Sequence, residues 1–112
     1  MNPLDFQALA LEFPETVEAP HFEKTSFRVR GKIFATMAPE RAEAVVKLTP
    51  IDQSVFVGHG GGTVYPVKGK WGEQGWTAID LDSADRALVR DMLACAYRTV
   101  APKSLAARLP RE

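Results

Sequence analysis

Cysteine and histidine are scarce in this sequence, and their scarcity excludes several kinds of site. Cys95 is the only cysteine, so no disulfide can form within the chain. His21 and His59 are the only histidines, and no CxxC, HxxxH or HxxE spacing of the kind that binds a metal occurs. We therefore expect neither a structural metal nor a cofactor. The lack of disulfides favours a reducing compartment, and we expect the protein to be cytoplasmic.

An excess of charge of one sign is also missing, as are long apolar runs. Fourteen basic and fourteen acidic residues give a formal net charge of zero, whereas strong nucleic-acid binders usually carry an excess of Lys and Arg. Any basic site must therefore arise from local segregation of charge. No apolar run approaches the roughly 18 residues of a membrane span, and the N-terminus resembles no secretory signal. With 112 residues, 46% of them hydrophobic, we expect one globular domain over residues 1–112 and no membrane partner.

A serine nucleophile in the usual hydrolase pattern is missing too. The stretch Gly58–Val64 reads GHGGGTV, which resembles one half of the oxyanion hole of lipases and esterases. None of the serines stands in the G-x-S-x-G pattern that such enzymes need. The sequence therefore predicts an exposed, glycine-rich loop from Gly58 to Gly75 and no catalytic motif. A small enzyme or ligand-binding protein stays open as an alternative, with His21 as the acid–base candidate in a pocket.

Helical periodicity and capping residues predict three helices: Leu4–Phe13, Pro50–Val57, and a segment from a cap at Asp82 or Ser83 to about Ala101. Asn2 can cap the first helix, which Pro14 ends. The last helix is amphipathic. Its apolar half comprises Ala84, Leu88, Val89, Met92, Leu93, Cys95, Ala96, Thr99 and Val100, and its polar half Arg86, Arg90, Asp91, Tyr97 and Arg98. Cys95 is thus expected to be a small core residue.

Alternation of apolar and polar residues predicts strands between these helices. The segment Thr25–Ala38 indicates a hairpin that turns at Gly31-Lys32, with Val29 opposite Phe34 and Phe27 opposite Thr36 on the core face. The outward face of this hairpin would carry Arg28, Arg30, Ile33 and Ala35. Two further strands are expected at Glu43–Thr49 and Trp76–Leu81. Strands grouped between helices favour an α+β fold, with a single antiparallel sheet and helices packed on one face.

The outward face of this sheet is the candidate site. Basic and aromatic residues gather there and on the neighbouring loop: Arg28, Arg30, Lys47, Lys68, Lys70, Trp71 and Trp76, with Tyr65 nearby. Basic groups neutralise phosphates and aromatic rings stack on bases, so the pattern favours DNA as a partner. Two other interpretations remain: a solvated strand face that happens to be basic, and a surface that binds a protein.

Five stretches follow one another in an order typical of a known family: Pro20–Phe22 (PHF), Lys24–Val29 (KTSFRV), Gly31–Ala35 (GKIFA), Gly75–Leu81 (GWTAIDL) and Val100–Leu109 (VAPKSLAARL). Together they resemble the MmcQ/YjbR family of small bacterial proteins. The resemblance implies a fold similar to CyaY, the bacterial frataxin, in the order α-β-β-β-α-β-α, and the family's usual description as DNA-binding proteins. Frataxins bind iron through an acidic first helix, but this chain offers only Asp5 and Glu12 there, so iron binding is not expected.

Overall fold

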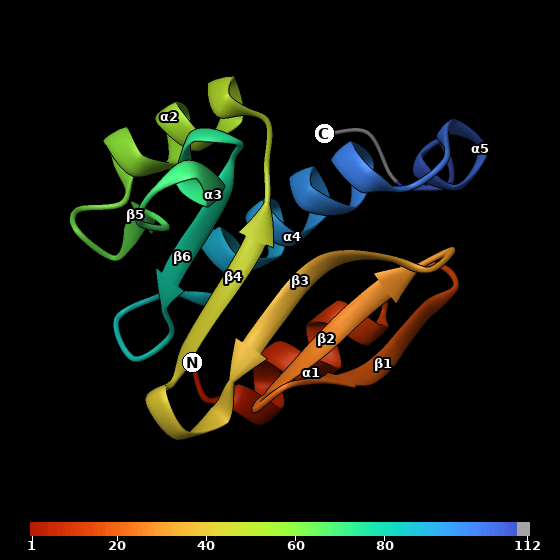
Figure 1. The fold of residues 1–112 in the computed structure, drawn as a ribbon, viewed down its shortest axis with the longest axis horizontal. Helices are drawn as coiled ribbons and strands as arrows, with labels where there is room; N and C mark the ends of the chain where they lie inside the picture. The colour runs from red at the N-terminus through yellow and green to blue at the C-terminus, as the bar shows by residue number, and fades with distance from the viewer. Residues whose placement is uncertain (110–112) are drawn as a thin grey trace.

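The protein is a six-stranded antiparallel sheet with the helices Pro3–Leu11 and Arg86–Val100 packed on one face, and with two further helices at one end of the sheet (Figure 1). The computed structural model describes residues 1–109. The strands are β1 (Thr16–His21), β2 (Lys24–Val29), β3 (Lys32–Ala38), β4 (Glu43–Lys47), β5 (Val64–Pro66) and β6 (Trp76–Asp80), in the spatial order β1-β2-β3-β4-β6-β5. The helices are α1 (Pro3–Leu11), α2 (Pro50–His59), α3 (Lys70–Glu73), α4 (Arg86–Val100) and α5 (Lys103–Ala106), with a 3-10 turn η1 (Pro39–Arg41). The predicted α+β class is confirmed.

Side-chain caps explain where the longer helices begin. The Asn2 side chain accepts from the amide of Asp5 at the start of α1, as the sequence predicts. At α4 the predicted cap is wrong, because Asp85 caps this helix by accepting from the amide of Leu88. Asp82 and Ser83 instead belong to a turn in which the carboxylate of Asp80 accepts from the Asp82 amide and the Ser83 hydroxyl.

The core lies between the sheet and the helices α1 and α4. The fully buried side chains include Phe6, Leu9, Phe27, Val29, Phe34, Met92, Leu93 and Tyr97. Tyr97 was expected on the polar half of α4, and this is wrong. Its ring stacks on Phe13 with centroids 5.2 Å apart, and its hydroxyl donates to the carbonyl of Pro14 at 2.6 Å. A tyrosine can be buried in this way because its one polar group has a partner. Cys95 is only partly buried, at the margin of this core.

The register of the β2–β3 hairpin differs from the prediction by the position of the turn and by a bulge. Arg30 and Gly31 form the turn, both with positive φ (51° and 80°), which is the two-residue geometry that suits a twisted hairpin. Val29 therefore pairs with Lys32, and Phe27 pairs with Ala35 rather than Thr36. The register shifts between Phe27 and Arg28, and the extra residue on β3 lets neighbouring side chains both reach the core.

β1 lies in a segment for which the sequence predicted no element, and β5 and α3 lie in the segment that it predicted to be a loop. β1 was not predicted because its sequence, TVEAPH, contains charged residues and a proline and does not alternate regularly between apolar and polar residues. β5 and α3 are only three and four residues long, too short for periodicity to show, and both lie within the expected loop Gly58–Gly75. His59 belongs to the last turn of α2, so the start of GHGGGTV is helical.

Candidate nucleic-acid interface

The face of the sheet opposite α1 and α4, here called the open face, carries three rows of side chains. The middle row crosses all six strands, and every residue in it except the last is small or medium-sized. Its members are Ala19, Ser26, Thr36, Val45, Ala78 and Tyr65. One flanking row holds Arg28 beside Ile33 and Lys47 beside Trp76. The other flanking row includes His21 beside Lys24 and Glu43 beside Asp80. The open face is therefore a shallow floor with different chemistry along its two long sides.

Basic and aromatic side chains gather where β4 ends and β6 begins. We call this group, Lys47, Lys68, Lys70, Trp71 and Trp76, the Trp corner. The ammonium of Lys47 lies 5.7 Å from the ring centroid of Trp76 and donates to the backbone carbonyl of Gln74. The rings of Trp71 and Trp76 meet edge to face at 6.2 Å, and Trp71 is 63% exposed. Lys68 and Lys70 are exposed and stand three residues and one residue before Trp71 in the chain.

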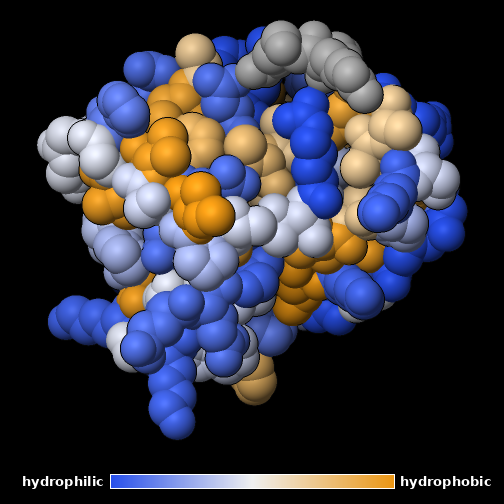
Figure 2. Space-filling view, turned by 90° about the horizontal axis from the view of Figure 1, so that it is seen from above, coloured by the Kyte–Doolittle hydropathy of each residue, from blue (hydrophilic) through white to orange (hydrophobic). Residues whose placement is uncertain are grey.

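Figure 2 looks down on this end of the molecule. Hydrophilic side chains project at the lower left, on the side that faces the viewer in Figure 1. Hydrophobic residues gather instead further back on the left, where Figure 1 shows α2. On that helix Ile51 and Val55 are 76% and 51% exposed and lie one turn apart. The exposed apolar side chains of α2 are thus separate from the charged surface of the open face.

Backbone contacts and one glutamine hold the Trp corner in position. The side-chain amide of Gln53, on α2, lies within 3.1 Å of the carbonyls of Gly72 and Trp76 and the hydroxyl of Thr77. Gly72, in α3, packs so closely on Val67 that a Cβ there would overlap the Val67 carbonyl oxygen. Sequence reasoning missed Gln53, since a polar residue on a short helix gives no pattern that points to a distant partner.

The two arginines of the predicted site have different surroundings. Arg28 is partly buried on the open face and donates through Nε to the hydroxyl of Ser26 at 2.9 Å. Arg30 lies in the hairpin turn instead of a strand and forms a two-point ion pair with Glu15, at 2.7 and 3.0 Å. These hydrogen bonds lower the pKa of Glu15 and raise that of Arg30. The expected outward strand position of Arg30 is therefore wrong, and a neighbouring carboxylate balances its charge.

Acidic groups occupy the opposite end of the open face. Glu43 accepts from the hydroxyl of Tyr65 at 2.9 Å and lies 3.7 Å from the guanidinium of Arg41. Asp80 pairs with Glu43 across β4 and β6. Burial, and then the hydrogen bond to Glu43, raises the pKa of Tyr65. The open face thus carries two carboxylates, Glu43 and Asp80, at the end away from Lys47 and Trp76, where Arg41 partly balances the charge of Glu43.

A wide cleft of about 790 Å³ lies at the tip of the β1–β2 hairpin, beside η1. It is lined by His21, Phe22, Glu23, Lys24, Ala38, Pro39, Glu40 and Arg41. The His21 ring meets Phe22 at 4.9 Å, and Phe22 is 95% exposed. Within residues 1–109, His21 makes no hydrogen bond to the carboxylates of Glu23 or Glu40. The cleft thus supplies a pocket near His21, but not the imidazole–carboxylate pair that acid–base catalysis favours.

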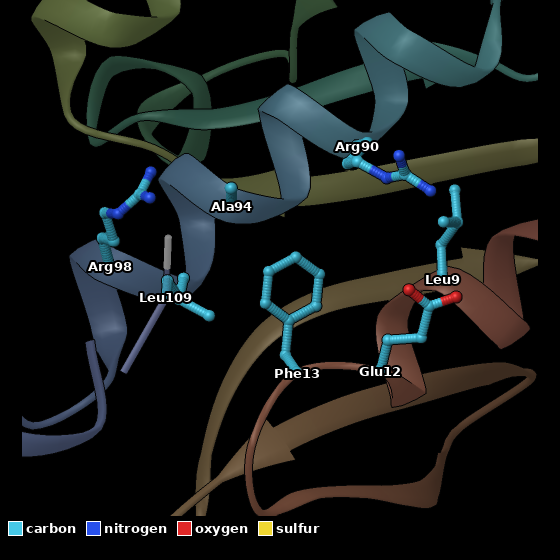
Figure 3. A pocket seen from close by; sticks show the side chains of 7 residues that line it. All are labelled: Leu9, Glu12, Phe13, Arg90, Ala94, Arg98 and Leu109. Carbon is cyan, nitrogen blue, oxygen red and sulfur yellow. The ribbon is translucent and has the colours of Figure 1, made fainter. Parts of the chain in front are cut away.

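A second cavity, of about 260 Å³, lies between α1 and α4 (Figure 3). Arg90, Ala94 and Arg98 recur every fourth residue and so share one side of α4. The small Ala94 leaves space above the ring of Phe13. Among the described residues, the lining includes no histidine, serine or cysteine. The cavity is on the helical side of the sheet, away from the open face.

The part of the chain from residue 1 to 109 holds no group of three or more His, Cys, Asp or Glu side chains that could bind a metal ion. His59, at the exposed end of α2, forms a hydrogen bond through Nδ1 with the carbonyl of Val55 at 2.9 Å. In the same stretch of chain, none of the helices is both long and apolar enough to cross a membrane.

The fold and its open face define a small α+β protein with one antiparallel sheet. A model of the YjbR family matches residues 11–99, and the chain belongs to that family. This confirms the resemblance seen in the sequence. The fold is similar to the crystal structure of Deinococcus radiodurans protein DR2400, described as a DUF419 domain, with a TM-score of 0.78 and 18% sequence identity. The similarity covers 97% of this chain and 89% of that one. No curated protein matches the sequence.

Proposed function

We propose that the protein binds DNA through the open face, with the Trp corner as the centre of the interface. The observation that carries the proposal is the contact of two tryptophan rings at one end of the sheet, with Lys47 over the Trp76 ring and the exposed Lys68 and Lys70 close to Trp71 in the chain. Lysine ammonium groups neutralise phosphates, and tryptophan rings stack on bases. Arg28, on the same flanking row of the sheet, adds a fourth cation.

The positions of the charged residues also support an interface that is confined to the end of the open face at the Trp corner. Glu43 and Asp80 lie four residues along β4 and β6 from Lys47 and Trp76, a distance of roughly 13 Å at about 3.3 Å per residue. This distance exceeds the Debye length of about 8–10 Å at moderate salt, so the two carboxylates repel phosphates bound at the Trp corner only weakly. Arg30 contributes little to the interface because Glu15 neutralises it.

The test is the salt dependence of binding, measured by fluorescence anisotropy of a labelled oligonucleotide. Four phosphate contacts predict a slope of log Kobs against log salt near −3 to −4, with dissociation constants on the order of 10⁻⁴ to 10⁻⁶ M at physiological salt. The double variant Lys68→Gln/Lys70→Gln should flatten the slope by roughly two units. The matched control is Arg86→Gln/Arg90→Gln, which removes two exposed charges from α4 on the opposite side.

The control should leave the slope unchanged. Absence of binding even at low salt, or the same slope for both double variants, would refute the assignment of DNA to the open face. A small anion or a protein would then be the better candidate partner for this surface.

A further inference from the structure

We infer that the Trp corner selects single-stranded over duplex DNA, with a base stacked on the ring of Trp71. The inference rests on the proposed function and specifies its substrate. The first observation is the exposure of Trp71: 63% of this residue is in contact with water although its ring packs edge to face on Trp76. An unpaired base offers a free face to such a ring, whereas the bases of a duplex are covered by their neighbours in the stack.

The second observation is that the backbone that carries the Trp71 ring is fixed by contacts within the protein, and that the ring itself packs on Trp76. Trp71 is in α3, whose Gly72 packs on the backbone of Val67 and whose carbonyl at Gly72 accepts from Gln53. Trp76, beneath it, is fixed in β6 and pairs with Lys47. A side chain that is already immobilised loses little conformational entropy when a ligand stacks on it.

The third observation concerns the distribution of charge around the ring. The ammonium of Lys47 lies over the Trp76 ring. Lys68 and Lys70 are exposed and stand three residues and one residue before Trp71 in the chain, so three cations belong to the segments that carry the stacking surface. The acidic end of the open face, with Glu43 and Asp80, begins roughly 13 Å away at about 3.3 Å per residue. A narrow single strand can follow the basic end alone, whereas a duplex lying on the sheet would bring phosphates toward both ends.

The fourth observation is that the described helices beside the Trp corner are poorly suited to reading a groove: α3 has four residues, and α2 carries no Lys or Arg. Major-groove recognition usually inserts a helix or a two-stranded ribbon. Within residues 1–109, the long helix α4 has its apolar stripe in the core on the other side of the sheet. The Trp corner itself offers α3, a helix of four residues. Flat aromatic surface flanked by lysines is instead the arrangement that single strands bind.

The experiment compares a twelve-nucleotide oligothymidylate with a twelve-base-pair duplex at the same salt concentration. The chain has two tryptophans, and both are in the Trp corner, so tryptophan emission excited at about 295 nm reports on this site alone. We expect the single strand to quench this fluorescence and to bind at least tenfold more tightly than the duplex. Trp71→Ala should weaken single-strand binding by roughly 5- to 150-fold and duplex binding by less than about twofold.

Two further variants make the outcome specific. Trp71→Phe keeps an aromatic face and should restore part of the single-strand affinity. Phe22→Ala removes an aromatic ring that is even more exposed, but at the hairpin tip, and should change neither affinity. Equal or tighter binding of the duplex, or equal losses on both ligands in Trp71→Ala, would overturn the inference and leave DNA binding itself intact. No binding of either ligand would overturn the proposed function as well.

Discussion

Gly72 and Gly58 should respond in opposite directions to the same substitution, alanine. Both glycines are helical and neither has a positive φ. A Cβ at Gly72 would overlap the carbonyl oxygen of Val67 and lie 2.9 Å from its carbonyl carbon, closer than the 3.0 Å that Cβ atoms respect. A Cβ at Gly58 would meet no atom within 4 Å. The two sites therefore separate steric exclusion from helix propensity.

The expected magnitudes follow from these surroundings. The obstacle at Gly72 is main chain and cannot rotate away, so Gly72→Ala should lower the free energy of unfolding by about 2–3 kcal/mol, the upper part of the range for overpacking. Gly58→Ala should raise it by about 0.5 kcal/mol, since alanine favours a helix and the site is near the end of α2. For a chain of this length, 1 kcal/mol corresponds to a shift of roughly 4 °C in Tm.

Urea unfolding followed by circular dichroism measures both changes, and tryptophan emission reports whether α3 has moved. We expect the emission of Gly72→Ala to shift in the folded state, because Trp71 precedes the substituted residue. Two results would contradict this reasoning: a Gly72→Ala protein as stable as the wild type, or equal stabilities of Gly72→Ala and Gly58→Ala. Either result would show that the close approach of α3 to Val67 does not constrain the Trp corner.

Further outcomes follow from single hydrogen bonds. Tyr97→Phe should lower stability by about 1 kcal/mol in urea, because the Pro14 carbonyl loses its donor. Burial raises the pKa of Tyr97, and that of Tyr65 is raised too, so absorbance at 295 nm should rise only above pH 10 in the folded protein. Because the pKa of Tyr97 is higher in the folded than in the unfolded protein, the neutral phenol contributes fully to stability below the unfolded pKa of about 10. This contribution should be lost as the pH rises through the pKa of the folded state. If unfolding left the tyrosine titration curve unchanged, the predicted rise of the pKa would be contradicted. Gln53→Leu should cost about 1 kcal/mol and shift tryptophan emission, and unaltered emission would argue against its positioning role.

The sequence predicts the fold class because its longer elements follow simple periodicity. Alternation in β2 and β4 and the apolar stripe of α4 indicate the sheet and the helix that covers it. The failures have local causes. Tyr97 looks polar in a helical wheel, but the single carbonyl of Pro14 suffices to bury it. The bulge beside Phe27 cannot be seen in a pattern, since alternation assumes that no residue is extra.

The candidate site is predictable in part. Lys47 and Trp76 could be assigned to the outward face because their neighbours in β4 and β6 claim the core. That Trp71 packs on Trp76 could not be predicted, since α3 is too short to show a period. The misassignment of Arg30 has one physical cause: Arg30 takes a left-handed turn position that Gly or Asn usually fills, so the turn was expected one residue later.

The prolines of the two outermost strands limit how copies of this protein can associate. β1 and β5 form the edges of the sheet, and they contain Pro20 and Pro66. A proline has no amide hydrogen to offer to a strand from another molecule, and β5 ends at its proline after only three residues. Continuation of the sheet from one molecule into the next is therefore discouraged at both margins, which leaves the faces of the molecule as its surfaces of contact.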